Sequence, residues 1–110
     1  MITELRFPEP FGSSLVELDL YDNQVSHIRS LDSFNELTML DLSFNKIKQI
    51  KGIKDLKKLR DLYLVQNKIK DIEGLDGLVN LSNLELGANR IRVSELLRKL
   101  FLYINMSCRK

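Results

Sequence analysis

The side chains that could support catalysis are few and isolated in this sequence. His27 is the only histidine and Cys108 is the only cysteine. Neither has companions that would form a nucleophile–base–orienter set or a group of metal ligands. The sequence also lacks a glycine-rich phosphate-binding loop. These residues predict a protein that is not an enzyme and that uses neither a cofactor nor a metal.

A column of asparagines is the other candidate for chemistry. Asn23, Asn45, Asn67 and Asn89 stand 22 residues apart. An asparagine side chain carries two N–H donors and an oxygen acceptor, so at a sharp turn it can satisfy backbone groups of its own repeat and of the adjacent one. We therefore interpret these four residues as a structural ladder, not as a binding site.

Each asparagine lies inside the same apolar frame, Leu-x-x-Leu-x-Leu-x-x-Asn-x-(Ile/Val)-x-x-Ile-x-x-Leu-x-x-Leu. The copies begin at Leu15, Leu37, Leu59 and Leu81. A fixed period of this length indicates one supersecondary unit stacked on copies of itself, here a leucine-rich-repeat solenoid of the α/β class.

The spacing within each copy predicts the elements. The Leu-x-Leu alternation has the period of a strand, with the leucines facing the core, so the stack should form a concave parallel β-sheet. After each asparagine the apolar spacing changes to three, which favours short 3₁₀ or irregular turns on the convex side. Gly52, Gly74 and Gly77 should mark the bends.

The 110 residues predict a single domain with four repeats over residues 15–92. Residues 1–14 should be an irregular N-terminal cover, because Pro8, Pro10 and Gly12 disrupt a regular repeat.

Residues 93–110 allow two interpretations. The frame restarts from Leu97 to Asn105, only 16 residues after Asn89, which would be a degenerate repeat. Alternatively, Ser94 caps a C-terminal helix that runs to Ile104. We favour the capping helix, because 16 residues are too few to continue the stack without distortion.

Composition bounds the cellular context. The chain is 44% hydrophobic and 29% charged, which indicates neither disorder nor a membrane-spanning protein. Its start has no basic region followed by an apolar stretch, so no secretory signal is expected. A single cysteine excludes an internal disulfide framework and favours a reducing compartment, the cytosol or nucleus.

The outward strand positions are where a solenoid varies its binding specificity. On the concave face these positions are mostly acidic, with aromatic side chains among them. They are Glu17, Asp19, Met39, Asp41, Asp61, Tyr63, Asn83 and Glu85, followed further along by Tyr21 and Phe44.

The residues around each isoleucine after the asparagine are basic in three repeats: Lys46, Lys48, Lys68, Lys70, Arg90 and Arg92. The net charge of +2 could suggest nucleic acid as a partner. However, the sheet itself carries carboxylates, which repel phosphate. We therefore interpret the basic residues as a solvated flank and do not expect nucleic acid to be the main partner.

Four segments resemble one family of leucine-rich-repeat proteins: Leu18-Asp-Leu-Tyr-Asp-Asn-Gln24, Leu40-Asp-Leu-Ser-Phe-Asn45, Leu62-Tyr-Leu-Val-Gln-Asn-Lys-Ile69 and Leu84-Glu-Leu-Gly-Ala-Asn-Arg-Ile-Arg92. The chain is similar in them to the protein phosphatase 1 regulatory subunit 7 family. This resemblance implies a monomeric binding module of nucleus and cytoplasm whose concave face holds the phosphatase catalytic subunit. The implied contact column falls on Asp19, Asp41, Tyr63 and Glu85.

The chain also departs from that family, whose members have about a dozen repeats where this chain has four. Two alternatives therefore stay open at this point. One is a nucleic-acid-associated or ribonucleoprotein scaffold that uses the basic flank. The other is a generic adaptor that binds a peptide or a helix.

Overall fold

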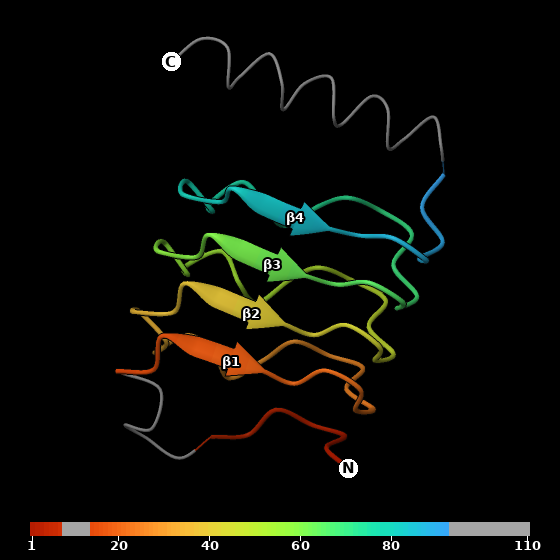
Figure 1. Ribbon diagram of the computed structural model, residues 1–110, viewed down its shortest axis with the longest axis horizontal. Helices are drawn as coiled ribbons and strands as arrows, with labels where there is room; N and C mark the ends of the chain where they lie inside the picture. Colours follow the sequence, from red (N-terminus) through yellow and green to blue (C-terminus); the bar gives the residue numbers. More distant parts are fainter. Residues whose placement is uncertain (8–13, 93–110) are drawn as a thin grey trace, which may run out of the picture.

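The computed structural model describes residues 1–7 and 14–92 and contains one parallel sheet. Its strands are β1 (Glu17–Asp19), β2 (Met39–Asp41), β3 (Asp61–Tyr63) and β4 (Asn83–Glu85), stacked in chain order (Figure 1). Residues exactly one period apart pair with each other, since Leu18, Leu40, Leu62 and Leu84 stand opposite one another. The predicted solenoid, its strands and their register are confirmed.

The repeat leucines and isoleucines form one continuous core. Leu40, Leu62 and Ile47 are completely shielded from solvent, and Phe34 is almost so. Each turn of the chain covers the apolar residues of its neighbours, as a stack of units that cannot bury their own apolar face requires. The core therefore runs lengthwise between the sheet and the convex side.

The convex segments are irregular turns, and the described residues contain no helix. Backbone bonds that span three residues recur there, as from Leu56 N–H to Ile53 O and from Leu59 N–H to Leu56 O, both 3.1 Å. The convex side matches the irregular alternative of the prediction. The capping helix and the degenerate repeat proposed for 93–110 lie outside the described residues.

The asparagine ladder connects neighbouring repeats. The Nδ2 of Asn45 donates to Leu42 O in its own repeat and to Leu20 O in the preceding one, each at 3.0 Å. Its Oδ1 accepts the Val25 N–H at 2.9 Å. Asn67 and Asn89 repeat this pattern one and two periods later. The prediction of a structural role is confirmed for these residues.

Residues 1–7 extend the ladder at the N-terminal end. Ile2 donates its N–H to Asn23 Oδ1 and accepts from the Gln24 N–H, each at 2.8 Å. Ile2 thus takes the place that Val25, Ile47 and Ile69 take in the full repeats. Leu5 is buried, and the ring of Phe7 packs edge-on against Phe34 at a centroid separation of 5.1 Å. The segment lies alongside β1 and covers that end of the core (Figure 1).

Each repeat passes through a left-handed backbone conformation just before its asparagine. The residues there are Asp22, Phe44, Gln66 and Ala88, with φ between 54° and 60°. A second left-handed position holds Ser30, Gly52 and Gly74. At Gly52 an added Cβ would lie 2.5 Å from the Ile28 carbonyl oxygen, so glycine is needed there for space as well as for φ.

Candidate functional site

The predicted contact column is assembled by the strand register. Asp19, Asp41, Tyr63 and Glu85 stand opposite one another on successive strands. Strands are about 4.8 Å apart, so these side chains form one continuous row across the sheet. Asp19 and Glu85, at its ends, are exposed, whereas Asp41 and Tyr63 are half-buried.

Two carboxylates of this row also stabilise the chain that follows them. Asp19 Oδ1 accepts the Tyr21 N–H at 3.0 Å, and Asp41 Oδ1 accepts the Ser43 N–H at 2.9 Å. These bonds define Asx turns at the strand ends. Part of the acidity that the sequence suggested for partner binding therefore serves the backbone in repeats one and two.

The neighbouring row consists of Glu17, Met39, Asp61 and Asn83. Here Asn83 Nδ2 donates to Asp61 Oδ1, which fixes both side chains on the open face of the sheet. Glu17 is exposed and Asp61 is half-buried.

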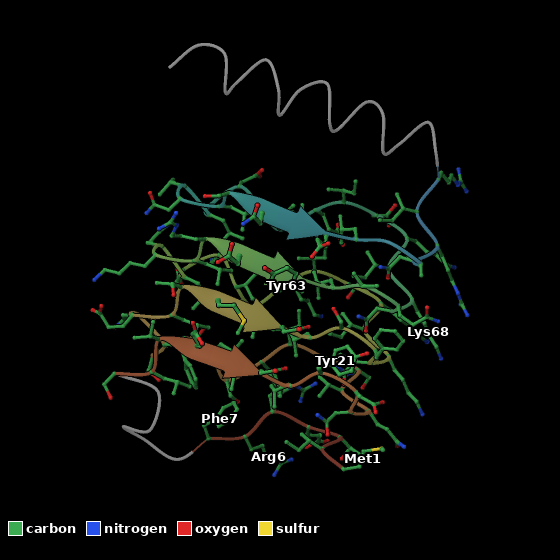
Figure 2. The ribbon with its side chains drawn as sticks, viewed as in Figure 1. Met1, Arg6, Phe7, Tyr21, Tyr63 and Lys68 are labelled. Carbon is green, nitrogen blue, oxygen red and sulfur yellow. The ribbon has the colours of Figure 1, made fainter. Side chains whose placement is uncertain are left out.

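Tyr63 experiences the negative charge of this face directly. Partial desolvation, followed by the charges of Asp61, Glu85 and Asp41, raises the pKa of its phenol above the usual 10.0. Asp41 and Glu85 stand opposite Tyr63 on the neighbouring strands β2 and β4, and Asp61 lies on β3 together with Tyr63, which is labelled in Figure 2. Tyr63 is thus a neutral aromatic side chain within an acidic surface.

Tyr21 and Phe44 lie outside this row, beyond the C-terminal ends of β1 and β2. Their rings contact each other at a centroid separation of 4.9 Å and an angle of 51°. Both remain exposed, with 51% of Tyr21 and 41% of Phe44 accessible. The structure therefore divides the aromatic residues named from sequence into Tyr63 on the sheet and a separate exposed pair.

The basic flank is also held in register. Lys46, Lys68 and Arg90 donate their backbone N–H groups to Val25, Ile47 and Ile69 of the preceding repeats, at 2.8–2.9 Å. The ion pairs among the described residues are Arg6–Glu4 and Lys58–Glu36. Neither involves a cation of the flank.

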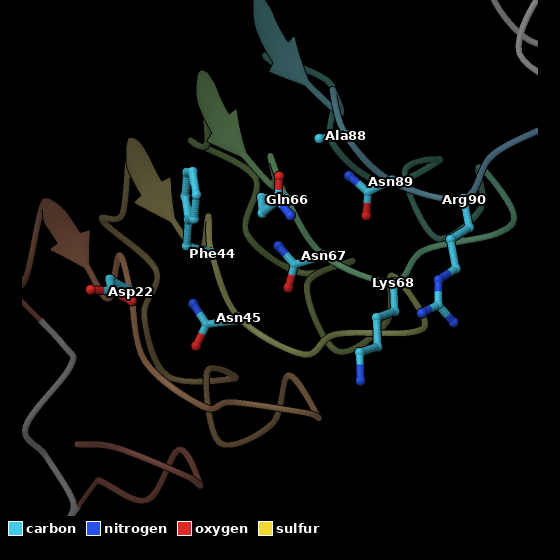
Figure 3. Close-up of a pocket in the computed structure, with 9 residues that line it drawn as sticks. All are labelled: Asp22, Phe44, Asn45, Gln66, Asn67, Lys68, Ala88, Asn89 and Arg90. Carbon is cyan, nitrogen blue, oxygen red and sulfur yellow. The ribbon is translucent and has the colours of Figure 1, made fainter.

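A shallow groove lies between the aromatic pair and the basic flank, and sequence reasoning did not find it. Its volume is about 430 Å³. Figure 3 shows Phe44 at one side and Lys68 and Arg90 at the other. The remaining lining residues are Asp22, Gln66, Ala88 and the ladder residues Asn45, Asn67 and Asn89. The sequence does show a periodic column of residues just before each asparagine, and these residues line the groove. The shape of the groove, however, depends on the left-handed turn at that column, which the sequence does not reveal.

The described residues offer little chemistry of other kinds. Ser26 Oγ lies 3.0 Å from Nδ1 of its neighbour His27 on the exposed surface, and the structure shows no acid bonded to that ring among the residues it describes. In the same part of the chain, no group of three or more His, Cys, Asp or Glu side chains could hold a metal. No helix there is long and apolar enough to cross a membrane.

Comparison with known proteins places this geometry in a broader class. The family described as Leucine Rich repeats (2 copies) matches residues 57–99. No curated protein matches the chain.

Two internalins from Listeria monocytogenes str. 4b F2365 have similar solved structures. Internalin InlF is 34% identical with a TM-score of 0.69, over 76% of this chain and 25% of that protein. Internalin C2 is 35% identical with the same TM-score, over 76% of this chain and 38% of that one. The chain thus spans well under half of the proteins it resembles in structure.

The 22-residue register, the asparagine ladder and these matches define the chain as a leucine-rich-repeat domain. Domains of this kind generally act as protein–protein interaction modules and not as catalysts. Neither internalin is described as a phosphatase regulator. Membership of the protein phosphatase 1 regulatory subunit 7 family therefore stays a prediction.

Proposed function

We propose that this domain is a non-catalytic module that binds a protein through its concave sheet. By the family resemblance, the partner we propose is the catalytic subunit of protein phosphatase 1, met in nucleus and cytoplasm. The observation that carries this proposal is the row Asp19, Asp41, Tyr63 and Glu85, held in register across four strands.

The row suits a partner that presents basic side chains around an apolar patch. Tyr63 offers a half-buried aromatic ring, and aromatic side chains are frequent anchors at interface centres. The carboxylates around it would attract a basic surface over a distance and orient it on arrival. Asp19 and Asp41 can do this while their Oδ1 atoms serve the backbone, because each retains a second oxygen.

The size of the sheet limits the affinity. Four strands at about 4.8 Å, each presenting about 15 Å of chain, give a face of roughly 300–400 Å². A standard interface covers about 800 Å² of each partner. We therefore expect weak binding by this face alone, with Tyr63 supplying much of the free energy.

Binding of purified phosphatase catalytic subunit to the immobilised domain tests the proposal. We expect Tyr63→Ala to weaken binding by roughly 2 kcal/mol, about 30-fold, since an aromatic anchor loses its packing. Glu85→Lys should act mainly on the association rate. Glu85→Lys should keep its stability within about 0.5 kcal/mol, because Glu85 is exposed. Tyr63 is half-buried, so the binding of Tyr63→Ala is measured at a temperature at which circular dichroism shows that variant to be folded.

The control is the double variant Lys46→Glu and Lys68→Glu on the flank, which should leave phosphatase binding unchanged. Loss of binding in the flank variant but not in the concave variants would show that the partner binds the basic flank and not the concave sheet. If the unmodified domain does not bind the phosphatase at all, the partner assignment is wrong and the generic adaptor is the surviving candidate.

A further inference from the structure

The groove beside the basic flank differs in chemistry from the concave sheet. Phe44 forms one side, Lys68 and Arg90 form the other, and Asp22 lies at the end nearest repeat one (Figure 3). The surface therefore changes from apolar to cationic over a short distance.

Phe44 is an unexpected residue for its position. The turn before each asparagine requires a left-handed backbone, and φ at Phe44 is 59°. Glycine, asparagine or aspartate tolerates that conformation better than a bulky side chain does. The ring is nevertheless 41% exposed, and its aromatic contact is with the equally exposed Tyr21. It thus contributes apolar surface to the groove more than it contributes to the core.

The cations opposite Phe44 are positioned and available. Lys68 is half-buried, and Arg90 is exposed one repeat away on the same ladder of backbone bonds. Neither forms one of the ion pairs found among the described residues. Stacked cations repel each other, so a ligand with negative charge would be favoured here.

Many polar groups along the floor of the groove are already bonded within the protein. The N–H groups of Phe44, Gln66, Lys68 and Arg90 all donate to carbonyls of neighbouring repeats. The ladder amides Asn67 and Asn89 are likewise engaged. The positive charge of the groove comes from the side chains of its walls, Lys68 and Arg90.

We propose that this groove binds an extended acidic segment of a second protein. An apolar side chain of the segment lies against Phe44, and its carboxylates pair with Lys68 and Arg90. The cationic part spans two repeats, about 5 Å, which accommodates two or three extended residues. A nucleic acid strand fits less well, because it carries a charge on every nucleotide and its phosphates would continue past the two cations towards Asp22, whereas a peptide can place its carboxylates opposite Lys68 and Arg90 alone. This site is independent of the phosphatase proposal, since it uses neither Tyr63 nor Glu85.

Fluorescence anisotropy with a labelled peptide of about twelve residues tests the site. The probe contains Glu and Ser with one central Leu; a second peptide has Lys in place of Glu, and a third probe is single-stranded oligouridylate. We expect saturable binding of the acidic peptide alone, weakened by added salt. Tighter binding of oligouridylate that is lost with the groove cations would assign the site to nucleic acid and overturn the proposal. Equal binding of both peptides would overturn it as well.

Charge reversal locates the binding site. The double variant Lys68→Glu with Arg90→Glu should bind the acidic peptide at least about tenfold more weakly. The matched control is Lys51→Glu with Lys54→Glu, which makes the same change in net charge at exposed positions outside the groove. An equal loss in both double variants would show attraction to net charge only, and the groove would be rejected.

Two further variants separate binding from folding. Phe44→Asn should bind the acidic peptide about five- to tenfold more weakly. Its melting temperature should stay equal or rise, because asparagine tolerates the left-handed turn. Asp22→Asn should tighten binding by about twofold by removing a repulsive charge. If Phe44→Asn lowers the melting temperature and leaves binding unchanged, the ring serves the fold and the proposal fails.

Discussion

Replacement of Asn67 by alanine tests how the repeats are held together. Asn67 is almost fully buried, and its Oδ1 is the acceptor for the Ile47 N–H at 2.9 Å. Its Nδ2 donates to Leu42 O and Leu64 O at 3.0 and 3.2 Å. Those two carbonyls keep one donor each in the variant, from Asn45 and Asn89. The Ile47 N–H, in contrast, loses its acceptor in the variant.

The expected loss of stability follows from this difference. One buried, unsatisfied N–H costs about 1–3 kcal/mol, and loss of the second bond at each carbonyl adds about 1 kcal/mol, for a total of roughly 2–4 kcal/mol. With a urea slope of about 2 kcal/mol per M, the unfolding midpoint followed by circular dichroism should fall by about 1–2 M.

Two variants make this measurement specific. Asn23→Ala removes the acceptor for Ile2, whose N–H is in an exposed segment and can bond to water, so we expect a loss of about 1 kcal/mol or less. Gln66→Ala, beside Asn67 but exposed, should change stability by less than about 0.5 kcal/mol. A midpoint for Asn67→Ala equal to that of Gln66→Ala would refute the ladder as a source of stability.

Three further measurements address the core, the turns and the sheet. Leu64→Ala, at a fully buried site, should lower the unfolding free energy in urea by about 2–5 kcal/mol; a loss below about 1 kcal/mol would contradict the packing described. Ser30→Gly should raise the melting temperature, since φ is 66° there, whereas Gly52→Ala should lower it because its Cβ would meet a carbonyl oxygen. Ultraviolet titration of Tyr63 should give a pKa above 10.0 that moves down in Glu85→Gln. Because the folded phenol then holds its proton when the unfolded one has lost it, stability should fall as pH rises above about 10; a pKa at or below 10.0 would be inconsistent with the acidic surface.

The sheet could be predicted in detail because its information is periodic. Once Leu18 and Leu40 are recognised as equivalent, the alternation of a strand places Asp19 and Asp41 side by side on the open face. The ladder followed in the same way, since only a side chain with both donors and an acceptor can serve two repeats at one turn. These inferences require only the repeat pattern of the sequence, and not the path that the backbone takes between the strands.

The remaining features depend on that path. Nothing local to Phe44 reveals a left-handed turn, because phenylalanine rarely adopts one and the geometry is imposed by the stack. For the same reason the groove and the Asx turn of Asp41 were not foreseen. Ile2 has no counterpart 22 residues later, so its place on the ladder emerges only when the N-terminal segment is seen against repeat one.

The asparagine ladder gives the solenoid a mechanical polarity. Each amide reaches backwards along the chain, so that Asn89 secures Ile69 and Asn67 secures Ile47. A force that pulls a repeat away on the C-terminal side also removes the asparagine Oδ1 that accepts a backbone N–H of the preceding repeat. A force on the N-terminal side detaches Ile2 from Asn23, but Asn23 keeps its bond to Leu20 O within its own repeat. Separation of two repeats therefore leaves a backbone N–H without its acceptor on the N-terminal repeat, and an asparagine side chain without its donor on the C-terminal repeat.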